Sequence, residues 1–177
     1  MSNISKWQEL SRKTAFKKYS RNLLSVDFRM ADGTVADYII DDRQGAACTL
    51  GLTEDNQVVL VRQFRPGPNA ILNELPGGYI EAGEDPITAA RREFIEETGY
   101  DGEFESVGSC LDDAYSTLDR ACFVAKNCRK VGEPQNTSTE QTEVVLVSLK
   151  EFRAALRKGR MTDVEVGYMG LDYLKLL

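Results

Sequence analysis

Residues 78–100 read GYIEAGEDPITAARREFIEETGY and carry the strongest structural signal in the chain. Glu93, Glu96 and Glu97 stand at positions i, i+3 and i+4, which are neighbours on one face of an α-helix. Three carboxylates on one helix face repel one another, and a divalent cation between them removes that repulsion. A solvated acidic helix face with an incidental arginine is the simpler alternative for this triple taken alone.

The cation predicted here is a hard one, because every ligand on offer is an oxygen atom. The chain contains no histidine, which excludes a His-rich catalytic zinc site. Mg²⁺ or Mn²⁺ fits an all-oxygen set best, and Mg²⁺ commonly binds one or two carboxylates together with substrate phosphates. The pattern therefore favours phosphate chemistry.

The spacing of the glycines, Glu84 and Arg92 around the triple resembles the box of the Nudix hydrolase family, G-x5-E-x7-R-E-U-x-E-E-x-G-U, in which U is bulky and apolar. Every defined position is filled, by Gly78, Glu84, Arg92, Glu93, Phe94, Glu96, Glu97, Gly99 and Tyr100. The resemblance implies an α/β (α+β) fold in which a mixed β-sheet is sandwiched between helices. It also implies hydrolysis of a nucleoside diphosphate linked to another moiety, with Mg²⁺ or Mn²⁺ as cofactor.

The same resemblance implies catalytic and metal-binding roles. Glu93, Glu96 and Glu97 are the expected metal ligands, and the backbone carbonyl of Gly77 is expected to join them. Arg92 is expected to orient the carboxylates, and Glu84 is expected to lie behind them or simply to face solvent. Glu140 is expected to act as general base and further metal ligand. Related enzymes often hold another acid two positions before that base, where this chain has Ser138.

Features outside the box resemble the branch that cleaves ADP-ribose and other nucleoside diphosphate sugars. Val61–Pro66 reads VRQFRP, in which Arg65 is expected to bind the diphosphate as a bidentate guanidinium can. Arg62 and Glu74 are further substrate-binding candidates, although alternate residues of a strand face opposite sides. Tyr115 either stacks on the base or sugar, or only packs.

The substrate expected from this branch is a nucleoside diphosphate sugar, with ADP-ribose as the leading example and GDP-mannose open. The products would be a nucleoside monophosphate and a sugar phosphate. The loop at 111–120 lacks the proline that ADP-ribose enzymes of this type usually carry, so its shape should differ. Two alternatives stay open: a Nudix enzyme for dinucleoside polyphosphates or non-canonical nucleoside triphosphates, and a catalytically inactive nucleotide-binding module.

Composition agrees with a cytoplasmic enzyme. The 177 residues are 42% apolar and 28% charged, and no apolar run reaches the ~20 residues of a membrane helix. The net charge of −6 argues against nucleic-acid binding. Four scattered cysteines without a C-x-x-C pair are typical of free thiols in a reducing compartment. We therefore expect neither a membrane nor a nucleic-acid partner.

The sequence predicts two parts of the chain, residues 1–44 and residues 45–177. Residues 1–44 predict a β-rich extension, with a strand from about Thr14 and a hairpin around Asp32-Gly33, and the family resemblance implies that this segment forms a homodimer. The resemblance implies that residues 45–177 form the hydrolase domain. Its box helix is predicted to begin near Pro86, with Ile87, Ala90, Phe94 and Thr98 as its core stripe and Gly99 as its C-cap. Capping boxes at 148–151 and 162–165 predict two later helices.

Overall fold

The computed structural model describes residues 4–136 and 141–177, and these divide into two compact units. One unit holds Met1–Gln44 together with Leu111–Asp119. The other holds Gly45–Cys110 and Arg120–Leu177. The segment Leu111–Asp119 therefore clusters with the N-terminal residues, although the division made on the sequence assigns it to the hydrolase domain.

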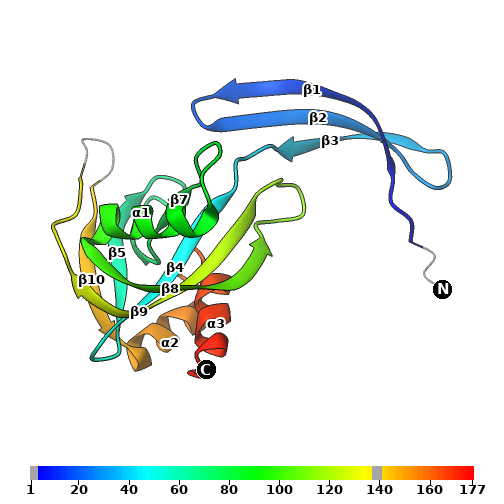
Figure 1. Cartoon of the computed structure of the whole chain (residues 1–177). Helices are drawn as coiled ribbons and strands as arrows, with labels where there is room; N and C mark the ends of the chain where they lie inside the picture. Colours follow the sequence, from blue (N-terminus) through cyan, green and yellow to red (C-terminus); the bar gives the residue numbers. More distant parts are fainter. Residues whose placement is uncertain (1–3, 137–140) are drawn as a thin grey trace. The chain divides into compact units, whose positions relative to one another are not determined.

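The N-terminal unit is built on a three-stranded antiparallel sheet in the order β1-β2-β3 (Figure 1). Its strands are β1 (Gln8–Lys18), β2 (Arg21–Arg29) and β3 (Val35–Asp41). The predicted hairpin at Asp32-Gly33 is confirmed, with Gly33 at a φ of 88°. The first strand begins earlier than the predicted Thr14, and every residue in it is exposed. Because this strand has no buried face, its start is not marked by an alternation of buried and exposed residues.

The second unit contains a seven-stranded mixed sheet in the order β10-β5-β4-β9-β8, with β6 paired to β5 and β7 paired to β4. Strands β4 and β9 run parallel, in register from Ala46 and Arg120 onward. The strands are β4 (Ala46–Thr53), β5 (Gln57–Arg65), β6 (Ala70–Glu74), β7 (Gly77–Tyr79), β8 (Tyr100–Leu111), β9 (Asp119–Lys130) and β10 (Glu143–Ser148).

Helices cover both faces of this sheet (Figure 1). Helix α1 (Pro86–Thr98) packs Ala89, Ala90 and Phe94 on one face, while α2 (Leu149–Lys158) and α3 (Val164–Tyr173) pack on the other. The mixed sheet between helices that the family resemblance implies is confirmed. No helix among the described residues is long and apolar enough to cross a lipid bilayer.

Two local predictions about the helices are wrong. Ile87 is 41% exposed and lies outside the core stripe, whereas Ala89 is fully buried. Ala90, Phe94 and Thr98 are buried as predicted, and Ala89 joins them in place of Ile87. The second capping box is also absent, since Asp163 precedes α3 with a φ of 57° and no capping hydrogen bond. Its carboxylate instead pairs with the Arg120 guanidinium at 3.1 Å.

Candidate active site

The box helix is held at both ends by its own sequence. Pro86 occupies the first turn, and the side chain of Asp85 accepts a hydrogen bond from the Ile87 amide at 3.0 Å. At the other end Gly99 adopts a left-handed conformation with a φ of 68°, as the sequence predicts. The helix therefore presents its glutamates at a fixed rotation above the sheet.

The two glycines of β7 bring backbone against the helix carboxylates. A Cβ atom placed on Gly78 would lie 2.3 Å from Cδ of Glu93 and 2.5 Å from both carboxylate oxygens. The neighbouring Gly77 amide donates to Oε2 of Glu97 at 2.8 Å. A side chain at position 78 would displace the Glu93 carboxylate, which explains why the box begins with glycine.

Arg92 ties the acidic side chains together. Its Nε and Nη2 atoms donate to the two oxygens of Glu84 at 2.9 and 3.0 Å. Its Nη1 atom donates to Glu93 at 2.8 Å and to Glu96 at 3.2 Å, and Nη2 also reaches the Tyr79 carbonyl at 3.1 Å. One guanidinium thus links the helix, the β7 end and the loop before the helix.

This pairing keeps both main partners charged. The hydrogen bonds that Arg92 donates to Glu84 raise the pKa of Arg92 well above its ordinary value and lower the pKa of Glu84. Of the two alternatives for Glu84, a place behind the metal ligands or a solvent-facing position, its pairing with Arg92 agrees with the first.

The expected metal ligands are close together but are not yet arranged as a cage. Glu93 and Glu97 both contact the Gly77-Gly78 backbone, and all the donors available there are oxygen atoms. Within residues 4–136 and 141–177, no group of three or more His, Cys, Asp or Glu side chains is already placed to hold a metal ion. The donors fit a hard divalent cation in chemistry, and the ion itself would draw the carboxylates inward. The expected base Glu140 lies outside the described residues.

Strand β5 separates the two arginine candidates onto opposite faces of the sheet. Val59 packs with Phe94 of α1, so the alternation of a strand places Val61, Gln63 and Arg65 on the helix α1 face. Arg62 faces the other way, where it binds Asn73 at 2.9 Å and Glu143 at 3.4 Å. The structure therefore does not bring Arg62 together with Arg65.

Arg65 is held by a buried carboxylate on the α1 face. Glu74, which pairs with Val61 in the β5–β6 ladder, is fully buried. Its Oε2 atom accepts from Arg65 at 2.7 Å and from Gln63 at 3.1 Å. Its Oε1 atom has no hydrogen-bond partner among the described residues. The sequence analysis did not select Gln63, although it shares the parity of Arg65 along the strand.

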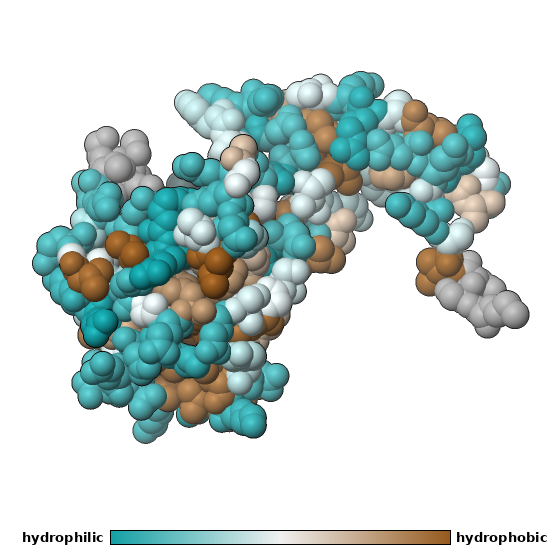
Figure 2. All heavy atoms as spheres, in the orientation of Figure 1, coloured by the Kyte–Doolittle hydropathy of each residue, from teal (hydrophilic) through white to brown (hydrophobic). Residues whose placement is uncertain are grey.

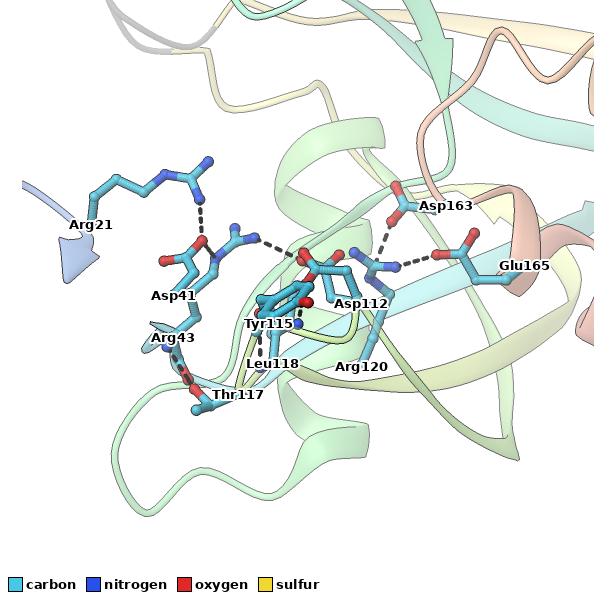
Figure 3. A network of polar contacts seen from close by, with 12 residues as sticks. Arg21, Asp41, Arg43, Asp112, Tyr115, Thr117, Leu118, Arg120, Asp163 and Glu165 are labelled. Atoms are coloured by element: carbon cyan, nitrogen blue, oxygen red, sulfur yellow. Dashed lines mark hydrogen bonds and ion pairs between the residues drawn. The ribbon is translucent and has the colours of Figure 1, made fainter. Parts of the chain in front are cut away.

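Tyr115 belongs to the N-terminal unit, where its ring stacks on Tyr38 with centroids 6.4 Å apart and an interplanar angle of 17°. Its segment is fastened to β3 through Asp41, whose amide donates to the Tyr115 carbonyl and whose carbonyl accepts from the Thr117 amide (Figure 3). Arg43 pairs with Asp112 at 3.2 Å in the same unit. Tyr115 thus packs on Tyr38 but is 57% exposed, so stacking on a base or sugar stays open as the other alternative.

A second polar group missed by the sequence analysis lies in the other unit. Arg120 at the start of β9 pairs with Asp163 and, at 2.6 Å, with Glu165 (Figure 3). Burial raises the pKa of Asp163, which Arg120 opposes. These ion pairs attach the start of α3 to the sheet and are structural.

An open cavity of about 610 Å³ is lined by α1 and β8. Arg92 borders it, but Glu93, Glu96 and Glu97 do not. Its lining is made by Ile87, Thr88, Arg91, Arg92, Ile95, Gly102, Glu103 and Phe104. The cavity explains where the unexpectedly exposed Ile87 lies, and it is separate from the carboxylate face.

Comparison with known proteins gives a consistent set of relatives. The model of the NUDIX domain matches residues 42–165. An ADP-ribose pyrophosphatase of Bacillus subtilis (strain 168) is 27% identical over 158 residues, which cover 85% of this chain and 82% of that protein. A methanol dehydrogenase activator of Bacillus methanolicus is 36% identical over 153 residues, with the same shares covered. Among solved structures, an ADP compounds hydrolase superposes with a TM-score of 0.83 at 19% identity, over 99% of this chain and 97% of that one.

Proposed function

This chain belongs to the NUDIX domain family, and from that premise we propose that it hydrolyses the diphosphate bond of a nucleoside diphosphate sugar, with ADP-ribose as the leading example. The products are a nucleoside monophosphate and a sugar phosphate. The Bacillus subtilis relative is named an ADP-ribose pyrophosphatase, and every defined position of the box is filled in this chain.

One observation carries the substrate class: Arg65 stands on the same sheet face as the box helix and is anchored there by a buried glutamate. The Arg65 side chain is 40% exposed although Glu74 is fully buried, so Arg65 is accessible to a ligand. A fixed guanidinium suits a diphosphate, because its planar fork donates two parallel hydrogen bonds.

The chemistry assigned to the carboxylates needs a divalent cation, for which we propose Mg²⁺ or Mn²⁺. When bound, such a cation supplies positive charge that makes phosphorus easier to attack and water easier to deprotonate. Glu93, Glu96, Glu97 and the Gly77 carbonyl would hold it, joined by Glu140. Arg92 keeps Glu93 and Glu96 in place through hydrogen bonds of 2.8 and 3.2 Å.

For proton removal we propose Glu140 as the general base. The neighbouring Glu143 is a weaker candidate, because its carboxylate pairs with Arg62 on the sheet face that α1 does not cover. Base catalysis by a positioned carboxylate contributes about 10²–10⁴-fold, so Glu140→Gln should lower kcat by that amount while Glu143→Gln changes it little.

The setting we propose is a cytoplasmic homodimer formed through residues 1–44. All four cysteines are unpaired thiols, as a reducing compartment maintains them. In the N-terminal unit β1 is exposed along its whole length, and apolar side chains interrupt the polar surface seen in Figure 2. Phe16, Val35 and Ile39, which the ladder places on one face, are each about half exposed. A second copy of the chain would cover them.

A panel of nucleotide sugars, dinucleoside polyphosphates and nucleoside triphosphates, assayed with Mg²⁺ and with Mn²⁺, tests the proposal. Release of a nucleoside monophosphate and a sugar phosphate from ADP-ribose or a related sugar nucleotide supports it. Release of pyrophosphate from a triphosphate as the main reaction would place the protein in another branch. Nucleotide binding without turnover on any of these compounds would identify an inactive module.

A further inference from the structure

We propose that Cys110 and Cys122 are a reversible dithiol–disulfide pair, a covalent modification site independent of the hydrolytic reaction. The two Sγ atoms are 3.6 Å apart. Cys110 lies near the end of β8 and Cys122 near the start of β9, the neighbouring strand.

The geometry requires only a small movement. A disulfide has an S–S length of about 2.05 Å, so the sulfur atoms must approach by about 1.6 Å from the observed 3.6 Å. Both thiols lie on adjacent strands and already point at each other. Changes in the two side-chain torsions can therefore supply this approach without moving the strands apart.

The two thiols differ in their exposure to solvent, and this difference determines which of them reacts first with an oxidant. Cys110 is partly exposed, whereas Cys122 is fully buried and its thiol donates to the Arg120 carbonyl at 3.3 Å. Burial and the neighbouring Cys110 raise the pKa of Cys122 to about 12. An oxidant from solvent therefore meets Cys110 first, and Cys122 acts second.

With hydrogen peroxide as the oxidant the steps balance. The Cys110 sulfur attacks one peroxide oxygen, the O–O bond breaks, and the products are a sulfenic acid and one water. The Cys122 sulfur then attacks the Cys110 sulfur and displaces the sulfenic oxygen, which leaves as a second water with the Cys122 proton. Two thiols and one peroxide thus give one disulfide and two waters. A small thiol reductant reverses the reaction by exchange.

The bond would link the two chain positions that flank the segment Leu111–Asp119. Cys110 is the last residue of the hydrolase unit before Leu111–Asp119, which belongs to the N-terminal unit, and the chain returns at Arg120. A Cys110–Cys122 disulfide would join the two strands from which this segment leaves. Oxidation should therefore restrict the segment while leaving the box helix untouched.

The experiment treats the full-length protein with hydrogen peroxide, blocks remaining thiols with an alkylating reagent and maps peptides by mass spectrometry without reduction. The expected main product carries a Cys110–Cys122 link, has lost two hydrogens and recovers four free thiols after dithiothreitol. Cys110→Ser and Cys110→Ala should both abolish the link. Cys128→Ser removes another buried β9 thiol and should leave the link as in the unaltered protein.

Three results would overturn the proposal. One is stable sulfinic or sulfonic acid on Cys110 without a cross-link. Another is a dominant link between Cys122 and Cys48, its register partner on β4. The third is a lack of oxidation under conditions that oxidise a small thiol. As an independent readout, backbone amide exchange within 111–119 should slow on oxidation of the unaltered protein and stay unchanged in the treated Cys110→Ser variant.

Discussion

Replacing Gly78 by alanine should lower the catalytic rate while leaving the stability of the fold nearly unchanged. The added Cβ would lie 2.3 Å from Cδ of Glu93, whereas carbon atoms in contact are normally about 3.5 Å or more apart. The carboxylate must therefore move by about 1.2 Å. Since Glu93 is the end of a flexible side chain, it can move without disturbing β7, but it then leaves its 2.8 Å contact with Arg92.

A displacement of about 1 Å in a catalytic group can cost roughly a hundredfold in rate, which corresponds to about 2.7 kcal/mol of activation free energy. We expect Gly78→Ala to lower kcat by about that factor. The variant should melt within a few degrees of the unaltered protein. Steady-state kinetics on the best substrate of the panel and thermal melts by circular dichroism measure the two effects.

Two other glycine substitutions act as controls. A Cβ on Gly77 would lie 2.4 Å from the Ala47 carbonyl oxygen and 2.9 Å from Cys48 Cα, which are backbone atoms of β4. Gly77→Ala should therefore destabilise the fold by about 1–3 kcal/mol, as overpacking does. Gly132→Ala meets nothing within 4 Å and should change neither property. A Gly78→Ala protein with kcat within threefold of the unaltered enzyme would show that the position of Glu93 is not critical.

Other substitutions test the remaining assignments. Glu97→Gln should lower turnover on the order of a thousandfold with the fold retained, since metal stabilisation of a transition state is worth several kcal/mol, and near-normal activity at saturating Mg²⁺ would remove Glu97 from the ligand set. Arg65→Ala should lower kcat/KM about ten- to a hundredfold, mainly through KM, without changing metal affinity measured by titration. Arg65→Lys should recover only part of that loss. If Arg65 serves only as the counter-charge of Glu74, both variants will lower stability and leave kcat/KM unchanged. The double variant Phe16→Lys/Ile39→Lys changes two exposed side chains and should give a folded monomer by light scattering; a dimer of unchanged mass would place the interface elsewhere.

The order of the elements could be predicted because its signals are local. Pro86 and Gly99 bound the box helix through backbone preferences that need no tertiary partner. The hairpin at Asp32-Gly33 follows from the same kind of preference. Where a distant residue competes for a side chain, local reasoning failed. The box at 162–165 predicts Thr162 as the cap, but α3 begins after Asp163, and Arg120, far away in the chain, pairs with the carboxylates of Asp163 and Glu165.

The sequence by itself determined the family, the mixed sheet and the acidic cluster, because the box encodes a helix whose side chains meet at fixed offsets. Only the tertiary structure decided which arginine of β5 shares the face of α1, since strand alternation becomes a face only when a helix packs on it. It also decided that Tyr115 stacks within the N-terminal unit and that Cys110 meets Cys122. Those contacts join residues whose separation in the sequence carries no periodic signal, so strand pairing and packing had to bring them together.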